Sequence, residues 1–178
     1  MSDKNIKFLI ATILSIVAIL FGFDLSVSNE NNSEQVEETQ YEEGDVVRIV
    51  DGDTVVVFTN NQKTKVRLIG VNTPETVDPR KEVECFGQEA SDFLKNILSD
   101  KKVELEIDET QGTYDKYERM LAYIFLNGEN INQKIIEEGY GYEYTYSVPY
   151  KYQESFKMLE AEAKENKIGL WGEACQSY

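Results

Sequence analysis

Apolar and polar residues alternate in five separate stretches of the chain. Three of these stretches follow one another closely, "VVRIV", "TVVVF" and "KTKVRLIG", and two come later, "KVELEID" and "ERMLAYIFL". They span residues 46–50, 54–58, 63–70, 102–108 and 118–126. A period of two is typical of β-strands with one buried face. The pattern therefore predicts five strands, the first three of them in a meander.

Three other stretches have a helical period. In "GQEASDFLKNIL", residues 87–98, the apolar side chains fall on one helical face. Residues 130–139 predict a short helix that ends at Gly139, and residues 150–169 predict a longer helix with Gly169 placed to end it. Five short strands interleaved with three helices predict an α+β, mainly β fold, a five-stranded OB-type barrel packed with three helices.

The N-terminal part of the chain has a different composition. Lys4 and Lys7 precede an uncharged run from Phe8 to Phe23. This run is slightly long for the core of a signal peptide and slightly short for a membrane span, and residues 26–28 form only a weak cleavage pattern. Residues 1–28 are thus expected to be a signal peptide or an N-terminal membrane anchor, with residues 8–23 as the possible membrane tether.

An acidic tract poor in apolar residues follows this segment. It buries too little apolar surface to offset the entropy of ordering, so residues 29–44 are expected to form a disordered linker. Residues 45–178 then form one globular domain, which we expect to be a monomer. Both interpretations of the N-terminus place this domain outside the cell, either secreted or anchored to the outer face of the membrane.

The charge balance limits the chemistry. The chain has a formal net charge of −15 and contains no histidine. The absence of histidine excludes serine–histidine triads, histidine bases and histidine metal sites. The acidic balance argues against a large basic surface for nucleic acid. Any phosphate chemistry must therefore be confined to a local site built from carboxylates, arginines, tyrosines or a hard metal ion.

The chain has two cysteines, Cys85 and Cys175, and both lie outside the predicted strands. In an exported protein an even number of cysteines favours a disulfide, with two free thiols as the alternative. A bridge between them would attach the C-terminal tail to the barrel.

Four polar motifs lie at strand ends or within strands, and each has a purely structural explanation. "DGDT" at residues 51–54 is a hairpin turn signal in which the glycine can adopt a positive φ. Arg67 in "VRLIG" can be a solvated strand residue, and "NTPET" at residues 72–76 can be an ordinary loop or helix start. Arg119 in "DKYERMLAY" can pair with a nearby acid such as Asp115.

Taken together, the motifs point to a family. The order "DGDT", "VRLIGVNTPE", "FGQEAS", "DKYERMLAY" and "KIGLW" resembles the staphylococcal nuclease (thermonuclease) family from about Val46 to Trp171. The resemblance implies an OB-type barrel with three helices. It also implies calcium-dependent hydrolysis of phosphodiester bonds in DNA and RNA, with 3′-phosphorylated products and Ca²⁺ as the cofactor.

The resemblance also implies a set of metal ligands. Asp53 would be a calcium ligand, Asn72 would occupy the second side-chain ligand position, and Thr73 would offer its backbone carbonyl. At position 72 the best-known members of the family carry an aspartate. An asparagine can still bind calcium through its side-chain oxygen, but it brings no charge, so we expect weaker calcium binding.

The remaining roles concern the phosphate and the water. By the same resemblance, Arg67 and Arg119 would hold the phosphate, Glu75 would orient or deprotonate the attacking water, and Lys116 and Tyr117 would line the nucleotide pocket. A phosphodiester gains charge on its equatorial oxygens as water attacks, and two guanidiniums supply planar donors for that charge. Because no histidine is present, Glu75 is the plausible base.

Two other functions explain less of the sequence than a nuclease does. A non-catalytic nucleic-acid or protein binding module on the same fold would be expected to lack the arginines and Glu75, which are present. A structural cell-surface protein on a stalk would not explain the clustered motifs. The segment "YGYEYTYSVPYKY" matches a region that contacts nucleotide bases in the family, and packing is an equally good explanation of its tyrosines.

Overall fold

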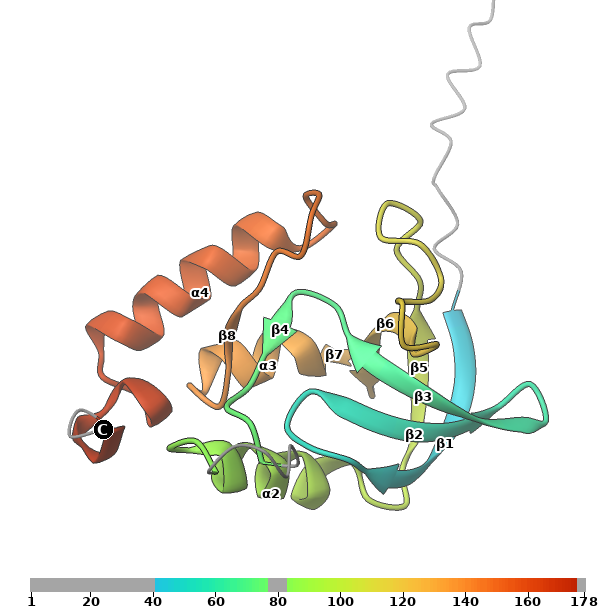
Figure 1. The fold of residues 1–178 in the computed structure, drawn as a ribbon, viewed down its shortest axis with the longest axis horizontal. Coiled ribbons are helices and arrows are strands. Elements are labelled where there is room, and N and C mark those ends of the chain that lie inside the picture. Colours follow the sequence, from blue (N-terminus) through green and yellow to red (C-terminus); the bar gives the residue numbers. More distant parts are fainter. Residues whose placement is uncertain (1–40, 77–82, 176–178) are drawn as a thin grey trace, which may run out of the picture. The chain divides into compact units, whose positions relative to one another are not determined.

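The computed structural model describes residues 41–76 and 83–175 (Figure 1). The strands are β1 (Tyr41–Ile49), β2 (Thr54–Thr59), β3 (Gln62–Leu68), β4 (Val71–Asn72), β5 (Lys102–Glu106), β6 (Met120–Leu126), β7 (Glu129–Asn130) and β8 (Tyr142–Glu143). The helices are α2 (Gly87–Leu98), α3 (Ile131–Glu137) and α4 (Gln153–Glu165), followed by the 3₁₀ turns η1 (Gly169–Trp171) and η2 (Glu173–Cys175). The predicted signal peptide or anchor lies outside the described residues, as does the linker up to residue 40. Within the described ranges, no helix is long and apolar enough to cross a membrane.

Five strands close into a barrel, as the alternating pattern predicts. The sheet order is β3-β2-β1-β5-β6-β7, and a further parallel pairing between β3 and β6 closes it. That pairing sets Val66 opposite Met120 and Leu68 opposite Ala122, all of them buried. The inward-facing residues of the five barrel strands therefore share one core, which is the α+β, OB-type architecture predicted from the sequence.

The three helices pack outside the barrel, and their apolar faces complete the core. Helix α2 contacts β1 and buries Leu94 and Leu98, while α3 buries Ile135 and Ile136 and packs against both β6 and α4. In Figure 1, α2 lies beneath the barrel and α4 lies at its side. The bounds of α2 match the predicted residues 87–98.

Two of the boundaries that differ from the prediction show what local patterns miss. Residues 41–44, which the sequence assigns to the linker, form the first half of β1, where Tyr41 pairs with Glu106 and its ring packs edge-on against Phe125 at 5.7 Å. This pairing with a distant strand orders a segment whose own composition favours disorder. At the other end, α4 stops at Glu165 rather than at Gly169.

Gly169 does not end α4, and it instead allows the backbone to pack closely against Gly139. It has a φ of +57° and begins η1, and a Cβ there would lie 2.2 Å from the carbonyl oxygen of Gly139. Gly139, which follows α3 with a φ of +68°, ends that helix as predicted. The two glycines thus allow the chain segments after α3 and after α4 to touch backbone to backbone.

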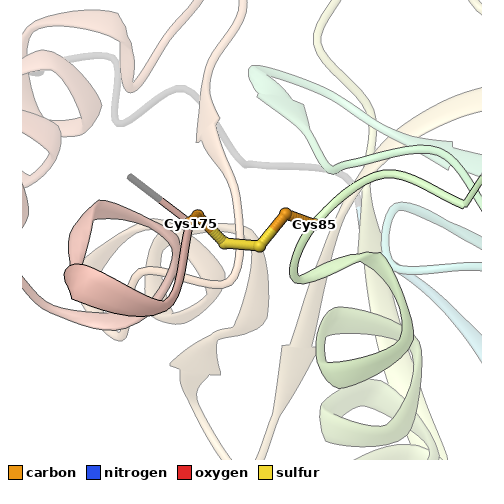
Figure 2. The surroundings of a disulfide bond; sticks show 2 residues. All are labelled: Cys85 and Cys175. Atoms are coloured by element: carbon orange, nitrogen blue, oxygen red, sulfur yellow. A yellow bond between two sulfur atoms is a disulfide. The ribbon is translucent and has the colours of Figure 1, made fainter. Parts of the chain in front are cut away.

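A disulfide joins Cys85 to Cys175, with a Cα–Cα distance of 5.7 Å (Figure 2). It connects the residues just before α2 to the last 3₁₀ turn, so the C-terminal tail is attached to the barrel side of the domain. This confirms the predicted pairing, and it excludes the alternative of two free thiols.

Replacing both cysteines by serine is expected to lower the free energy of unfolding by about 4 to 5 kcal/mol, because the bridge closes a long loop in the unfolded chain. The two half-cystines are 90 residues apart in the sequence. Urea unfolding of the oxidised protein and of the double serine variant measures the difference. Equal midpoints for the two proteins would show that the bridge does not stabilise the fold.

Candidate active site

A cleft of about 700 Å³ opens over one end of the barrel. Its walls come from the turn after β1, the segment from the end of β3 to residue 75, the loop before β6, and residues 142–147 around β8. The cleft is lined by all eight residues to which the resemblance assigns a catalytic, metal or substrate role: Asp53, Arg67, Asn72, Thr73, Glu75, Lys116, Tyr117 and Arg119. The structure therefore brings residues from four separate sequence motifs to one place.

The "DGDT" segment forms the turn between β1 and β2. The backbone N–H groups of Val50 and Asp51 both donate to the carbonyl of Thr54, and the Asp51 carboxylate accepts from the N–H of Asp53. Gly52 is not among the residues with a positive φ. A Cβ at this position would lie 2.7 Å from the hydroxyl of Thr73, so the glycine serves close approach, which corrects the expected turn geometry.

Asp53 is buried at the base of the cleft, with 7% of its surface exposed. One carboxylate oxygen accepts from the hydroxyl of Thr54 at 2.9 Å, and the other accepts from the backbone N–H of Thr73 at 3.1 Å. The same second oxygen forms an ion pair with Arg67 at 3.1 Å. A buried carboxylate with this many partners is fixed in orientation.

Arg67 reaches the cleft from the end of β3. One guanidinium nitrogen donates to the carbonyls of Leu68 and Val71 at 2.7 Å each. The other, Nη2, donates to Oδ1 of Asn72 at 3.0 Å and pairs with Asp53. The side chain is only 11% exposed. Arg67 is therefore a cation fixed by protein partners, and the alternative that it is simply a solvated strand residue is wrong.

The oxygens around Arg67 suit a hard cation. Oδ2 of Asp53 and Oδ1 of Asn72 both lie within 3.1 Å of the same nitrogen, so two oxygen donors converge on one positive centre. Burial, and then the neighbouring charge of Asp53, raise the pKa of Asp51 to about 6. Among the described residues no group of three or more acidic, histidine or cysteine side chains is arranged to hold a metal ion. A cation here would thus have to use amide or backbone oxygens as well, which are ligand types that calcium accepts.

Arg119 lies at the other side of the cleft and is held by Asp115. Its Nε and Nη2 both approach Oδ2 of Asp115 at 2.7 Å, and its backbone N–H donates to Oδ1. Burial opposes ionisation of Asp115, but the backbone and side-chain hydrogen bonds from Arg119 outweigh it and hold the pKa of Asp115 below its ordinary value. The pairing expected from the sequence is present, and it orients a guanidinium that also lines the cleft.

Lys116 and Tyr117 form the outer edge of this wall. The Lys116 ammonium lies 5.0 Å from the centre of the Tyr117 ring, and the Arg119 guanidinium lies 5.4 Å from it. Tyr117 is 66% exposed, so one aromatic surface faces solvent beside two cations. A base with its phosphate could contact all three groups.

Glu75 follows β4 at the rim of the cleft and is half-buried. Its Oε1 accepts from the N–H of Thr76 at 2.9 Å, and its own N–H donates to the Glu84 carboxylate at 3.0 Å. Glu75 thus lines the same cleft as Arg67 and Arg119.

Four further tyrosines line the cleft and were not named as site residues from the sequence. Tyr144 and Tyr146 are exposed, Tyr114 is exposed beside Asp115, and Tyr142 is half-buried next to Asn72. Three of them, Tyr142, Tyr144 and Tyr146, belong to the repeated tyrosines of residues 140–152, whose register the sequence leaves open. The sequence indicates only a turn role for Asp51, but the structure places this residue in the lining of the cleft.

A buried polar network lies next to the cleft wall that residues 142–147 form. Glu106 is 1% exposed, and its two oxygens accept from Lys151 at 2.7 Å and from the hydroxyl of Tyr152 at 2.8 Å. Asp108 accepts from the hydroxyl of Tyr123 and from the N–H of Lys151, both at 2.9 Å. The network ties the end of the tyrosine segment to β5 and β6 and so fixes one wall of the cleft.

Comparison with known proteins gives the same family as the motifs. The family model described as "Staphylococcal nuclease homologue" matches residues 65–173. A thermonuclease of Staphylococcus hyicus is 41% identical over 126 residues, which cover 71% of this chain and 73% of that protein. An uncharacterized protein of Methanocaldococcus jannaschii is 33% identical over 93% of this chain and 94% of its own length. The endonuclease YncB of Bacillus subtilis is 36% identical over 71% of this chain and 60% of its own length.

Fold, cleft and relatives thus define a hydrolase of the nuclease class. The chain belongs to the staphylococcal nuclease family.

Proposed function

We propose that this protein is a calcium-dependent nuclease that hydrolyses phosphodiester bonds of DNA and RNA and leaves 3′-phosphorylated products. One observation carries the proposal: two oriented guanidiniums, a rim carboxylate and converging oxygen donors line the same cleft. A phosphodiester is an anion that gains negative charge as water attacks it, and the two guanidiniums supply positive charge in fixed geometry.

Arg67 and Arg119 hold the scissile phosphate from two sides. Each guanidinium is already fixed by protein partners, Arg67 by Asp53 and two carbonyls and Arg119 by Asp115. Neither has to be ordered when the substrate binds, and a fixed donor stabilises developing charge without reorganisation. Glu75 orients the attacking water and accepts its proton.

Calcium would be held by the side-chain oxygens of Asp53 and Asn72 and by the backbone carbonyl of Thr73. When bound, the ion would add positive charge beside the phosphate and help to position the water. Asp53 is the charged member of this set, and its buried carboxylate is aligned by Thr54 and Thr73.

Lys116 and Tyr117 bind the nucleotide beside the scissile bond. Their exposed position on the cleft wall suits contact with a phosphate and the face of a base. The net charge of −15 leaves little attraction for phosphates beyond the cleft. Binding then depends on contacts within the cleft rather than on a long basic groove.

We further propose that the domain works outside the cytoplasm as a monomer, either secreted or tethered through residues 8–23. The disulfide supports this location, because such bridges persist in oxidising compartments. Secreted protein without residues 1–28 would indicate cleavage, and membrane-bound protein of full mass would indicate a tether.

Analysis of the product ends tests the proposed reaction. The purified protein is incubated with a DNA and an RNA oligonucleotide in the presence of calcium, and the fragments are analysed by mass spectrometry. Fragments of both substrates ending in a 3′-phosphate are expected. Fragments that carry 5′-phosphates would contradict the reaction, and intact oligonucleotides would favour a binding module.

Replacing Asn72 by aspartate is expected to lower the calcium concentration that gives half-maximal activity. The change adds a charged ligand at a position where the neutral amide now lies 3.0 Å from Arg67, and ligand charge is a main control on calcium affinity. Activity titrated against calcium for both proteins measures the shift. An unchanged half-saturation would mean that position 72 does not bind the metal.

A further inference from the structure

Tyr142 contacts Asn72 directly, although 70 residues separate them in the sequence. The two residues face each other across the short antiparallel pair of β4 and β8. The Nδ2 group of Asn72 donates to the Tyr142 hydroxyl at 2.5 Å. Residues directly opposite on neighbouring strands are close enough for such a contact to be specific.

The other side of the Asn72 amide is held by Arg67. Nη2 of Arg67 donates to Oδ1 of Asn72 at 3.0 Å. A guanidinium has donors and no acceptor, so only the carbonyl oxygen of the amide can face it. The amino group must then point the opposite way, and there it meets the hydroxyl of Tyr142.

The backbone around Tyr142 is held in place independently of this bond. The N–H of Tyr144 donates to the carbonyl of Gly70 at 3.1 Å, and the N–H of Gly141 donates to the carbonyl of Ile135 at 3.2 Å. A Cβ on Gly141 would lie 2.8 Å from the carbonyl oxygen of Asn72, so the two strands approach closely at this point. Tyr142 is thus a partner in a fixed position.

We propose that Tyr142 is a positioning residue that keeps the carbonyl oxygen of Asn72 turned toward the cation site. The inference rests on the proposed function, in which Asn72 is a calcium ligand. An amide has one oxygen that can bind a cation and one amino group that repels it, so a rotated Asn72 is no ligand. A carboxylate has two equivalent oxygens, so an aspartate at position 72 would not need Tyr142 for this purpose.

The contrast between asparagine and aspartate gives a test that does not depend on activity. Calcium chloride is titrated calorimetrically into the purified full chain and into three variants: Tyr142→Phe, Asn72→Asp and the double variant. Tyr142→Phe removes one hydroxyl from a half-buried ring, so the fold is expected to persist, and thermal unfolding of each variant checks this.

In the natural Asn72 background, Tyr142→Phe is expected to raise the Kd for calcium by about tenfold or more, the usual loss when the partner of a metal ligand is removed. In the Asn72→Asp background the same change is expected to raise the Kd less, because either carboxylate oxygen can bind the cation and no amino group can take its place.

Other outcomes overturn the inference in different ways. An equal shift in both backgrounds would show that Tyr142 acts through packing of β8 and not through the amide. An unchanged Kd in the Asn72 background would show that the Tyr142 hydroxyl does not contribute to calcium binding. No calcium binding by the natural protein would remove the proposed cofactor, and the inference with it.

Discussion

Replacing Arg119 by lysine is expected to lower kcat by about 10²- to 10³-fold, the usual cost of one lost donor to transition-state charge. Lysine keeps the charge but lacks the planar fork that can bind Asp115 and a phosphate oxygen at the same time. Arg119 makes the Asp115 contacts through Nε and Nη2, on a loop at the edge of the barrel. The fold should therefore persist, and steady-state kinetics with a calibrated oligonucleotide measures the effect.

Arg48→Lys is the matched control, because Arg48 is an exposed residue of β1 away from the cleft. Its kinetics should equal those of the natural protein. Arg67→Lys is expected to reduce kcat at least as strongly as Arg119→Lys, and also to lower stability, since Arg67 holds two carbonyls and Asn72. A kcat within a few-fold of normal for Arg119→Lys would remove this arginine from the mechanism.

Replacing Glu75 by glutamine is expected to lower kcat by about 10²- to 10⁴-fold at saturating calcium, which is the usual contribution of a general base. Glutamine keeps the shape of the side chain and can still accept from the N–H of Thr76, so the rim should remain in place. It cannot take a proton from the attacking water. Single-turnover cleavage at several calcium concentrations measures the effect on the chemical step.

Two results would change the role of Glu75. Recovery of the rate at high calcium would mean that this carboxylate supports metal binding and not the water. A normal rate at all calcium concentrations would exclude it from the reaction. Glu89→Gln, an exposed position in the first turn of α2 outside the cleft, is the control and should leave the rate unchanged.

The regular elements of the fold could be predicted because their patterns are local. The apolar face of α2 repeats over three turns, and the predicted bounds of 87–98 match the helix. The alternation in "TVVVF" and "KTKVRLIG" likewise follows from burial of one strand face, and Val55, Val57 and Val66 are fully buried. Patterns of this kind can be recognised within a short window of sequence, without knowledge of distant contacts.

The features that the sequence did not reveal depend on distant partners. Strands β4 and β8 have two residues each, too few to show a period, and they exist because Val71 and Asn72 meet residues 142–143. Residues 41–44 look like part of an acidic linker but pair with β5. The sequence pattern predicts that Gly52 is a turn glycine, but the structure shows that glycine is needed because the Thr73 hydroxyl lies too close for a Cβ.

The sequence predicted which residues form the site, but it did not predict how they contact one another. The resemblance named eight residues, and all of them line one cleft. It did not show that Arg67 bridges the oxygens of Asp53 and Asn72, because those contacts depend on how the end of β3 turns into β4. Tyr142 belongs to the tyrosine-rich segment, but nothing in that segment indicates its contact with Asn72, which lies 70 positions earlier.

The dependence of cleavage on calcium tests the central claim most directly. The initial rate on a single-stranded DNA and on an RNA oligonucleotide is measured for the purified protein as calcium is raised, and again in excess chelator. We expect cleavage of both substrates that rises with calcium, saturates only at high calcium, about 10⁻⁴ to 10⁻³ M, the range typical of extracellular calcium modules, and stops in chelator. Full activity in chelator would contradict the calcium mechanism, and no cleavage at any calcium concentration would contradict the nuclease itself.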